Sequence, residues 1–155
     1  MLMKGHSAPA FSVANQHHQT INLADYKGRN HVILYFYPKD DTPGCTIEAR
    51  QFTALAGEFA RANSVVLGVS KDSCDSHQAF IEKYQLGVML LADSDGRLCQ
   101  DYGVWQQKEK DGVKKMGIVR STFIINKQGI IEEALYGVNP DGHAQAMLQR
   151  VSQLK

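Results

Sequence analysis

Cysteine is scarce in this sequence, and its spacing matches neither a redox pair nor a zinc motif. The 155 residues include three cysteines, Cys45, Cys74 and Cys99, and no two of them form a Cys-Xaa-Xaa-Cys pair. A disulfide scaffold needs more cysteines, and a structural zinc site needs four ligands in closely spaced pairs. We therefore expect neither of these, and no metal or other cofactor.

An excess of charge and a long apolar run are also missing. The formal net charge is +1, and no basic cluster exceeds two adjacent residues, so we expect no nucleic-acid or anionic-membrane partner. No apolar stretch approaches the roughly 20 residues of a membrane helix, and the N-terminal residues lack the apolar core of a signal peptide. We expect a cytoplasmic protein that binds neither membranes nor nucleic acid.

The remaining composition is ordinary for a folded domain. The length suits one domain with a single core, and 43% of the residues are hydrophobic and 21% charged. No repeat, linker or low-complexity segment interrupts the chain. The sequence therefore predicts one domain over residues 1–155, and we expect it to be a monomer.

Apolar strands alternate with amphipathic segments along the chain. Residues 31–37 form a β-branched and aromatic run that is typical of a strand buried on both faces, and a helical stripe follows to about Ala62. A second apolar strand at 65–70 completes a β–α–β unit, whose strands should be parallel and whose crossover should be right-handed. This order predicts an α/β protein.

Further elements are expected on both sides of this unit. Before it, 11–14 and 20–23 form a hairpin, and His17 and His18 at its tip are exposed turn residues rather than metal ligands. After it we expect a helix that starts near Cys74 and ends at Gly87, a strand at 89–92, a short helix at 98–102, an exposed loop at 106–112, a hairpin of 118–126 with 129–135, and a final helix from Asp141.

The stretch that begins at Pro38 joins the first long strand to the first helix. Pro38 ends the strand because it has no N–H to donate. Thr42 and Pro43 predict the helix start, with the Thr42 hydroxyl as N-cap and the proline at the first helical position. Cys45 then lies in the first turn, where the helix dipole and the free N–H groups favour a thiolate over a thiol.

Charged residues bear on whether Cys45 is a nucleophile. Asp40 and Asp41 would disfavour a nearby thiolate, so we expect both side chains to point to solvent. Arg120 is the odd residue in an otherwise apolar or small strand, and a buried guanidinium needs an anion, which Cys45 or Glu48 would supply. The residues alone leave two alternatives open: Arg120 reaches water from a strand end, and Cys45 is only a small packing residue.

The residues around Cys45 resemble a family signature. Pro38-Xaa-Xaa-Xaa-Thr42-Xaa-Xaa-Cys45 is similar to the active-site motif of the peroxiredoxins, and 36–48 is similar to the PrxQ, or bacterioferritin comigratory protein, subfamily. The likeness continues in Gly68-Val-Ser-Lys-Asp-Ser, Leu91-Ala-Asp-Ser-Asp-Gly, Tyr102-Gly-Val-Trp and Gly117-Ile-Val-Arg-Ser-Thr-Phe-Ile-Ile. It covers nearly the whole chain and implies a thioredoxin-like fold, with a central mixed sheet flanked by helices and an N-terminal β-hairpin extension.

The resemblance also implies a reaction. The Cys45 thiolate attacks the terminal oxygen of a hydroperoxide and becomes a sulfenic acid. The implied function is the thiol-dependent reduction of hydrogen peroxide and organic hydroperoxides, in antioxidant defence and redox homeostasis. The implied reductant is thioredoxin or a similar dithiol.

Specific roles follow for the matching residues. Thr42, the Cys45 backbone N–H and Arg120 are the implied donors that hold the peroxide in line and stabilise the departing oxygen. Pro38 and Pro43 shape the pocket and limit water. Glu48 is a supporting residue beside them.

The sequence departs from many family members in how the sulfenic acid returns to thiol. Many relatives have a resolving cysteine five residues after the nucleophile, where this chain has Arg50. Others resolve from the following helix, which makes Cys74 the candidate, whereas Cys99 is expected to be a buried bystander. A Cys45–Cys74 disulfide would require the first helix to unfold in part, because disulfide-bonded Cα atoms lie about 4.4 to 6.8 Å apart. Resolution by Cys74 and a one-cysteine mechanism with an external thiol both remain open.

Two other functions are compatible with the same type of fold. A thiol–disulfide oxidoreductase is one, although the missing Cys-Xaa-Xaa-Cys counts against it. A non-enzymatic thioredoxin-like interaction or chaperone module is the other. Peroxide consumption that depends on Cys45 would favour the peroxidase over both.

Overall fold

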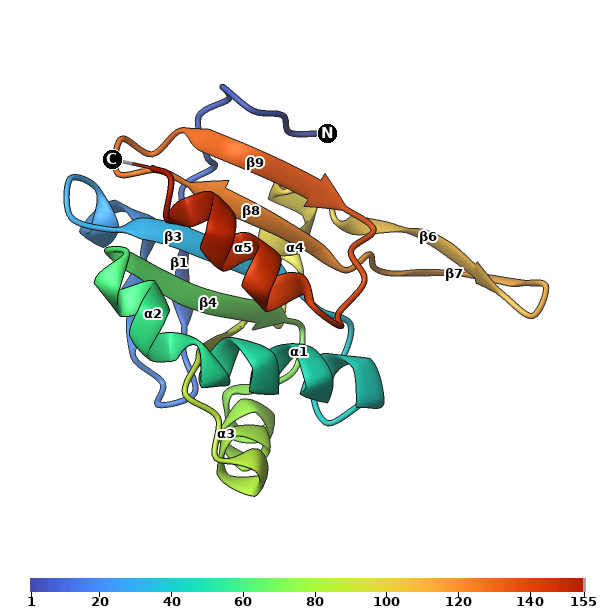
Figure 1. The fold of residues 1–155 in the computed structure, drawn as a ribbon. Coiled ribbons are helices and arrows are strands. Elements are labelled where there is room, and N and C mark those ends of the chain that lie inside the picture. The colour runs from blue at the N-terminus through green and yellow to red at the C-terminus, as the bar shows by residue number, and fades with distance from the viewer. Residues whose placement is uncertain (155) are drawn as a thin grey trace.

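A five-stranded mixed sheet forms the centre of the computed structural model, which describes residues 1–154 (Figure 1). The strand order is β5-β4-β3-β8-β9. β3 pairs in parallel with β4 and antiparallel with β8, while β4 and β5 are parallel and β8 and β9 antiparallel. The strands are β3 (His31–Phe36), β4 (Ser64–Ser70), β5 (Met89–Ala92), β8 (Ser121–Ile125) and β9 (Ile131–Tyr136). The predicted β–α–β unit and mixed sheet are therefore confirmed.

Helices and a hairpin cover the two faces of this sheet (Figure 1). One face packs against α1 (Pro43–Ala54), α2 (Ala56–Arg61), α3 (Cys74–Tyr84) and α5 (His143–Val151). The other packs against α4 (Arg97–Asp101), the hairpin of β1 (Ser12–Ala14) with β2 (Thr20–Asn22), and the 3-10 turn Leu23–Tyr26. This is the thioredoxin-like arrangement with the expected N-terminal extension.

Strand β3 is buried on both faces, as its apolar run predicts. Val32, Leu34 and Phe36 point into the core beneath the N-terminal hairpin and α4. Ile33 and Tyr35 point into the core beneath α1, α2 and α5, because successive side chains of a strand alternate between faces. Cys45 belongs to this second core, so the candidate nucleophile is supported by the sheet.

Helix boundaries differ from the predicted ones in three places. The stripe expected to reach Ala62 is divided at Leu55, whose φ of −102° and ψ of 9° are not helical; Phe52 and Phe59 on either side both stay buried. Tertiary packing thus overrides the continuous periodicity. α3 ends at Tyr84 rather than Gly87, because Gln85 adopts a left-handed conformation, and α5 begins at His143 rather than Asp141.

The exposed loop predicted at 106–112 is wrong. Strands β6 (Trp105–Lys110) and β7 (Val113–Ile118) form an antiparallel ribbon that extends away from the rest of the molecule (Figure 1). Asp111 and Gly112 connect them with φ values of 54° and 77°, the two positive values that a tight hairpin turn needs. The ribbon has no apolar face because most of it contacts solvent, so it lacks the alternation that identifies a strand in sequence.

The hairpin expected at 118–126 and 129–135 is present as β8 and β9, although Ile118 ends β7 and β8 starts only at Ser121. Within residues 1–154, no helix combines the length and the apolar character needed to cross a membrane.

Candidate active site

Cys45 lies in the first turn of α1, as predicted, and is 2% exposed. Thr42 occupies the N-cap position with Pro43 after it, but the expected hydroxyl cap is wrong. The Thr42 hydroxyl instead donates to the Lys39 carbonyl at 2.9 Å, and the first backbone bond of the helix runs from Thr46 N to Thr42 O. The Cys45 N–H precedes that bond and therefore has no carbonyl within the helix to which it could donate.

Arg120 joins the thiol and a buried carboxylate. Its Nη2 donates to Cys45 Sγ at 3.3 Å, and its Nη1 donates to Glu48 Oε1 at 2.7 Å. The residue lies in the connection between β7 and β8, so its placement inside a strand is wrong. Its side chain is only 15% exposed, which excludes the alternative that it extends into water. Both partners that the sequence suggested, Cys45 and Glu48, thus contact one guanidinium.

A glycine makes the space for this guanidinium. A Cβ at Gly44 would lie 3.2 Å from Arg120 Nη2 and 3.4 Å from Pro140 Cγ, closer than most side chains tolerate. Sequence analysis missed Gly44, although a glycine inside the first turn of a helix costs stability and calls for a reason. The close approach of Arg120 supplies that reason.

Glu48 is buried completely, and its charge is unfavourable despite the ion pair. Burial raises the pKa of Glu48 to about 7, and the Arg120 guanidinium only partly opposes this. Its Oε2 has no hydrogen-bond partner among the described residues. Burial also acts to lower the pKa of Arg120, but Glu48 and Cys45 outweigh it and raise that pKa, so Arg120 remains a cation.

Tyr35 is a further polar residue at this site that sequence analysis did not identify. Its ring stacks on Phe52 with centroids 4.7 Å apart, and its buried hydroxyl has no partner within residues 1–154. Burial, then the nearby Glu48 and Cys45, raise the pKa of Tyr35 well above its ordinary value, so the hydroxyl stays protonated. A Cβ at Gly68 would come within 2.7 Å of this ring; a glycine inside strand β4 was the available signal.

The two aspartates before the helix behave differently. Asp41 is exposed, as predicted, and accepts hydrogen bonds from Lys83 Nζ at 2.7 Å and Tyr84 Oη at 2.5 Å. The prediction that Asp40 points to solvent is wrong, because this residue is only 7% exposed. Its carboxylate accepts from Tyr37 at 2.5 Å and bonds to His77 Nδ1 at 2.7 Å. These partners compensate for the burial of its charge.

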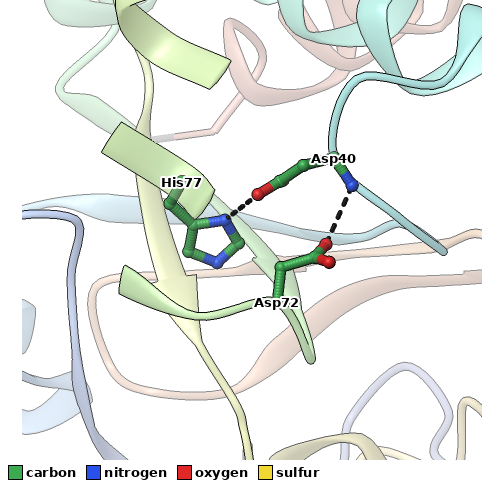
Figure 2. Close-up of side chains that lie close together, drawn as sticks. All are labelled: Asp40, Asp72 and His77. Carbon is green, nitrogen blue, oxygen red and sulfur yellow. Dashed lines mark hydrogen bonds and ion pairs between the residues drawn. The ribbon is translucent and has the colours of Figure 1, made fainter. Parts of the chain in front are cut away.

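Asp40, Asp72 and His77 also lie close enough to one another to suggest a metal site (Figure 2). Their hydrogen bonds explain the arrangement without one. Asp72 Oδ2 accepts from the Asp40 N–H at 2.8 Å and from the Ser70 hydroxyl at 2.6 Å, and His77 Nε2 bonds to the Leu91 carbonyl at 2.8 Å. We describe the cluster as a hydrogen-bond network that joins the Cys45 loop to α3.

The remaining predicted residues are two prolines and two cysteines. Pro38 and Pro43 are exposed. Cys74 is the first residue of α3, as predicted, is half-buried and has a free thiol. Cys99 is buried in the opposite core, and its burial and the adjacent Asp93 raise the pKa of its thiol, so it lies away from the reactive site.

Comparisons with known proteins agree with this geometry. The AhpC/TSA family model matches residues 4–134. The chain is similar to a Helicobacter pylori protein that carries the name peroxiredoxin bcp, with 46% identity over 145 residues, 94% of this chain and 95% of that one. It is 40% identical to peroxiredoxin Bcp of Bacillus subtilis over 150 residues, 97% of this chain and 95% of that one.

A solved structure is also similar. The bacterioferritin comigratory protein of Xanthomonas campestris superposes with a TM-score of 0.86 at 36% identity, covering 91% of this chain and 89% of that one. Sequence, fold and the arrangement around Cys45 thus agree. The chain belongs to the AhpC/TSA family as a Bcp-type peroxiredoxin and is a thiol-dependent peroxidase.

Proposed function

We propose that Cys45 is the peroxidatic nucleophile and that Thr42 and Arg120 complete its catalytic site. The observation that carries this proposal is the Arg120 guanidinium, which donates to Cys45 Sγ and to Glu48 at the same time. A cation fixed beside the sulfur stabilises the thiolate, and its position is set by a second buried acceptor.

The proposed reaction forms one bond and breaks one. The Cys45 thiolate attacks the terminal peroxide oxygen, the S–O bond forms as the O–O bond breaks, and the departing alkoxide or hydroxide takes a proton to leave as alcohol or water. The Arg120 guanidinium and the free Cys45 N–H stabilise the charge that develops on the departing oxygen. The Thr42 hydroxyl, whose proton is directed at Lys39, is available to accept a hydrogen bond from the peroxide, so its role is the reverse of the donor expected from sequence.

The proposed substrates are hydrogen peroxide and organic hydroperoxides. The related Xanthomonas campestris protein is described for its alkyl peroxide reduction activity. In this chain Cys45 belongs to the same apolar core cluster as Tyr35 and Ala49, so the sulfur has apolar surroundings on its inner side. Pro38 and Pro43 are both exposed in the segment before Cys45, and they have no N–H that would compete for the peroxide.

Regeneration is proposed to use a thiol from Cys74 or from an external reductant, with thioredoxin or a similar dithiol as the final electron source. Intact mass after one equivalent of peroxide distinguishes the two routes. If Cys74 resolves, the wild type loses two hydrogens and Cys74→Ser instead gains one oxygen. If both proteins gain an oxygen, an external thiol resolves Cys45.

The proposed setting is the cytoplasm, with the chain acting as a single monomeric domain over residues 1–155. Sedimentation equilibrium of the reduced protein tests the monomer directly. A mass twice that of the 17.2 kDa chain would contradict it.

A peroxide-consumption assay with a dithiol reductant tests the activity itself. Cys45→Ser should abolish turnover, whereas Cys99→Ser, at a buried thiol in the other core, should retain it. Insulin reduction without peroxide turnover would indicate a thiol–disulfide oxidoreductase, and the absence of both activities an interaction module.

A further inference from the structure

The main chain of Arg120 is held by the connection between β9 and α5, residues 137–142 (Figure 1). The Arg120 carbonyl accepts hydrogen bonds from the N–H groups of Gly137 and Val138, both at 2.9 Å. This carbonyl belongs to the rigid peptide unit that follows the Arg120 Cα. The two bonds therefore fix the point from which the guanidinium side chain extends toward Cys45.

Gly137 allows both N–H groups to reach one oxygen. The ladder between β8 and β9 ends at the pair of Ser121 with Tyr136, and the chain turns at the next residue, where Gly137 has a φ of 76°. Glycine adopts this left-handed conformation without strain, whereas a residue with a Cβ is strained there. A side chain at position 137 would therefore favour a turn of the backbone that moves these N–H groups away from Arg120.

The middle of the connection lies beside the side chain of Arg120. A Cβ at Gly44 would lie 3.2 Å from Arg120 Nη2 and 3.4 Å from Pro140 Cγ, so the guanidinium and the proline ring approach the same point of α1. Pro140 is half-buried there, and it has no N–H that could compete for Cys45 or Glu48. The connection thus holds the backbone of Arg120 at its start and borders the guanidinium in its middle.

The far end of the connection is fixed to α1 by a single carboxamide. Gln51 Nε2 donates to Asp141 Oδ1 at 2.7 Å, and Gln51 Oε1 accepts from the Gly142 N–H at 2.9 Å. Gln51 follows Glu48 by three residues, so the two side chains are neighbours on the helix surface. α1 is therefore linked to Arg120 in two ways: Glu48 binds the guanidinium directly, and Gln51 holds the connection that binds the carbonyl.

We propose that residues 137–142 position Arg120 for the peroxide reaction, with Gly137 and Gln51 as the two positioning residues. Gly137 sets the backbone of Arg120, and Gln51 keeps the connection in register with the helix that carries Cys45. Both residues act through Arg120, so the inference rests on the proposed role of that guanidinium. A misplacement of about 1 Å in a positioned group can slow a reaction about 10²-fold, so even a partial shift of Arg120 should be measurable.

The first test compares Gly137→Ala with Gly129→Ala in the full-length protein. Gly129, in the turn between β8 and β9, is the matched control because its φ is 81° and a Cβ would meet no atom within 4 Å at either glycine. Both variants should lose stability to a similar extent in urea unfolding. Stopped-flow kinetics should show Cys45 oxidation by hydrogen peroxide slowed about tenfold in Gly137→Ala and changed less than about twofold in Gly129→Ala.

The second test needs no change of the backbone. Gln51→Glu removes the donor to Asp141 and brings two carboxylates together, so at low ionic strength it should slow Cys45 oxidation about fivefold. Asp141→Asn keeps an acceptor for Gln51 and should change the rate less than about twofold. Combining both substitutions reverses the direction of the hydrogen bond and should restore the rate to within about twofold of the wild type.

The two variants should also lose their effect when Arg120 is absent. In an Arg120→Ala background, Gly137→Ala and Gln51→Glu should cause no further slowing, because residues that act through one group are not additive. Wild-type rates in both single variants, or the same slowing with and without Arg120, would overturn the positioning role. An Arg120→Ala protein that oxidises at the wild-type rate would overturn the proposed function instead.

Discussion

At the scale of single residues, the charge around Cys45 depends on a carboxyl group that is itself near neutrality. Glu48 shares Arg120 with the thiol, and burial raises its pKa to about 7. When Glu48 is protonated, the whole positive charge of Arg120 is available to Cys45. When Glu48 is ionised, Arg120 interacts with both Glu48 and Cys45. Glu48 thus links the strength of the Arg120 contact to pH in the neutral range.

The same pKa shift predicts how Glu48 affects stability. Its pKa lies above the ordinary value of 4.5 in the folded state, so the folded protein binds the proton more tightly than the unfolded chain does. The stability of the wild type relative to Glu48→Gln should therefore fall as pH rises from about 4.5 to about 7 and then stay level. Urea unfolding of both proteins across this pH range measures the difference in their stability. A difference that increases with pH would contradict the raised pKa of Glu48.

Gly44 provides a test of the space around Arg120. An alanine Cβ would lie 3.2 Å from Nη2, so Gly44→Ala should displace the guanidinium and slow the peroxide reaction about tenfold, while replacing glycine in a helix adds about 0.5 to 1 kcal/mol of stability. Gly57→Ala in α2 is the control, because its nearest neighbour is Arg61 at 3.7 Å. It should be stabilised in the same way with an unchanged rate. Equal rates in both variants would show that Gly44 does not serve Arg120.

At the scale of elements, the packing of α5 on the sheet should depend on pH. His143 begins this helix, is 7% exposed and bonds to Thr122 Oγ1 at 2.8 Å. Burial, then Arg120 and Arg150, lower the pKa of His143 to about 4. The neutral imidazole therefore stabilises the fold fully at pH values above 6.5, the ordinary pKa of histidine. This contribution to stability is lost as the pH falls from 6.5 toward 4.

His143→Gln isolates this effect, since glutamine keeps a polar partner for Thr122 and does not titrate. Relative to the variant, the wild type should lose about 2 kcal/mol of stability between pH 7 and pH 5, as measured by urea unfolding. The relative stability thus rises with pH for His143, whereas it falls with pH for Glu48. A difference that stays constant across this range would mean that folding does not lower the pKa of His143.

The β6–β7 ribbon should be dispensable for the chemistry. The ribbon extends from the body of the protein, and four of the six residues of each strand are exposed. Replacing the segment from Lys108 to Lys115 by a two-residue Asn-Gly turn should leave the rate of Cys45 oxidation within about twofold, because a two-stranded ribbon adds little stability to the core. Stopped-flow kinetics measures this rate, and a loss of more than tenfold would place the ribbon in the site.

At the scale of the whole molecule, local patterns predicted what depends on neighbours in sequence. The order of elements, the double burial of β3 and the position of Cys45 in the first helical turn all follow from periodicity and from the helix-start residues. The need of a lone guanidinium for an anion named Cys45 and Glu48 as its candidate partners but left open that Arg120 reaches water, and the family resemblance favoured the contact that the structure has.

Contacts between distant residues explain what was missed. Asp40 is buried because His77, 37 residues away, compensates for its charge, and nothing in the local sequence of Asp40 indicates that partner. The Tyr35 hydroxyl, which has no partner among the residues that the structure describes, and the space left by Gly68 likewise depend on how β3 and β4 pair. The ribbon was missed because it has no buried face to produce a pattern.

One kinetic comparison tests the central claim that a cation held beside the Cys45 sulfur drives its reaction with peroxide. The second-order rate constant for Cys45 oxidation by hydrogen peroxide is measured for the wild type, Arg120→Ala and Arg150→Ala. Arg150→Ala is the control, because Arg150 pairs with Glu133 on the surface. We expect Arg120→Ala to react about 10² to 10³ times more slowly, as for the loss of one donor to a developing oxyanion, and Arg150→Ala to react like the wild type. An Arg120→Ala protein that folds and reacts at the wild-type rate would contradict the account.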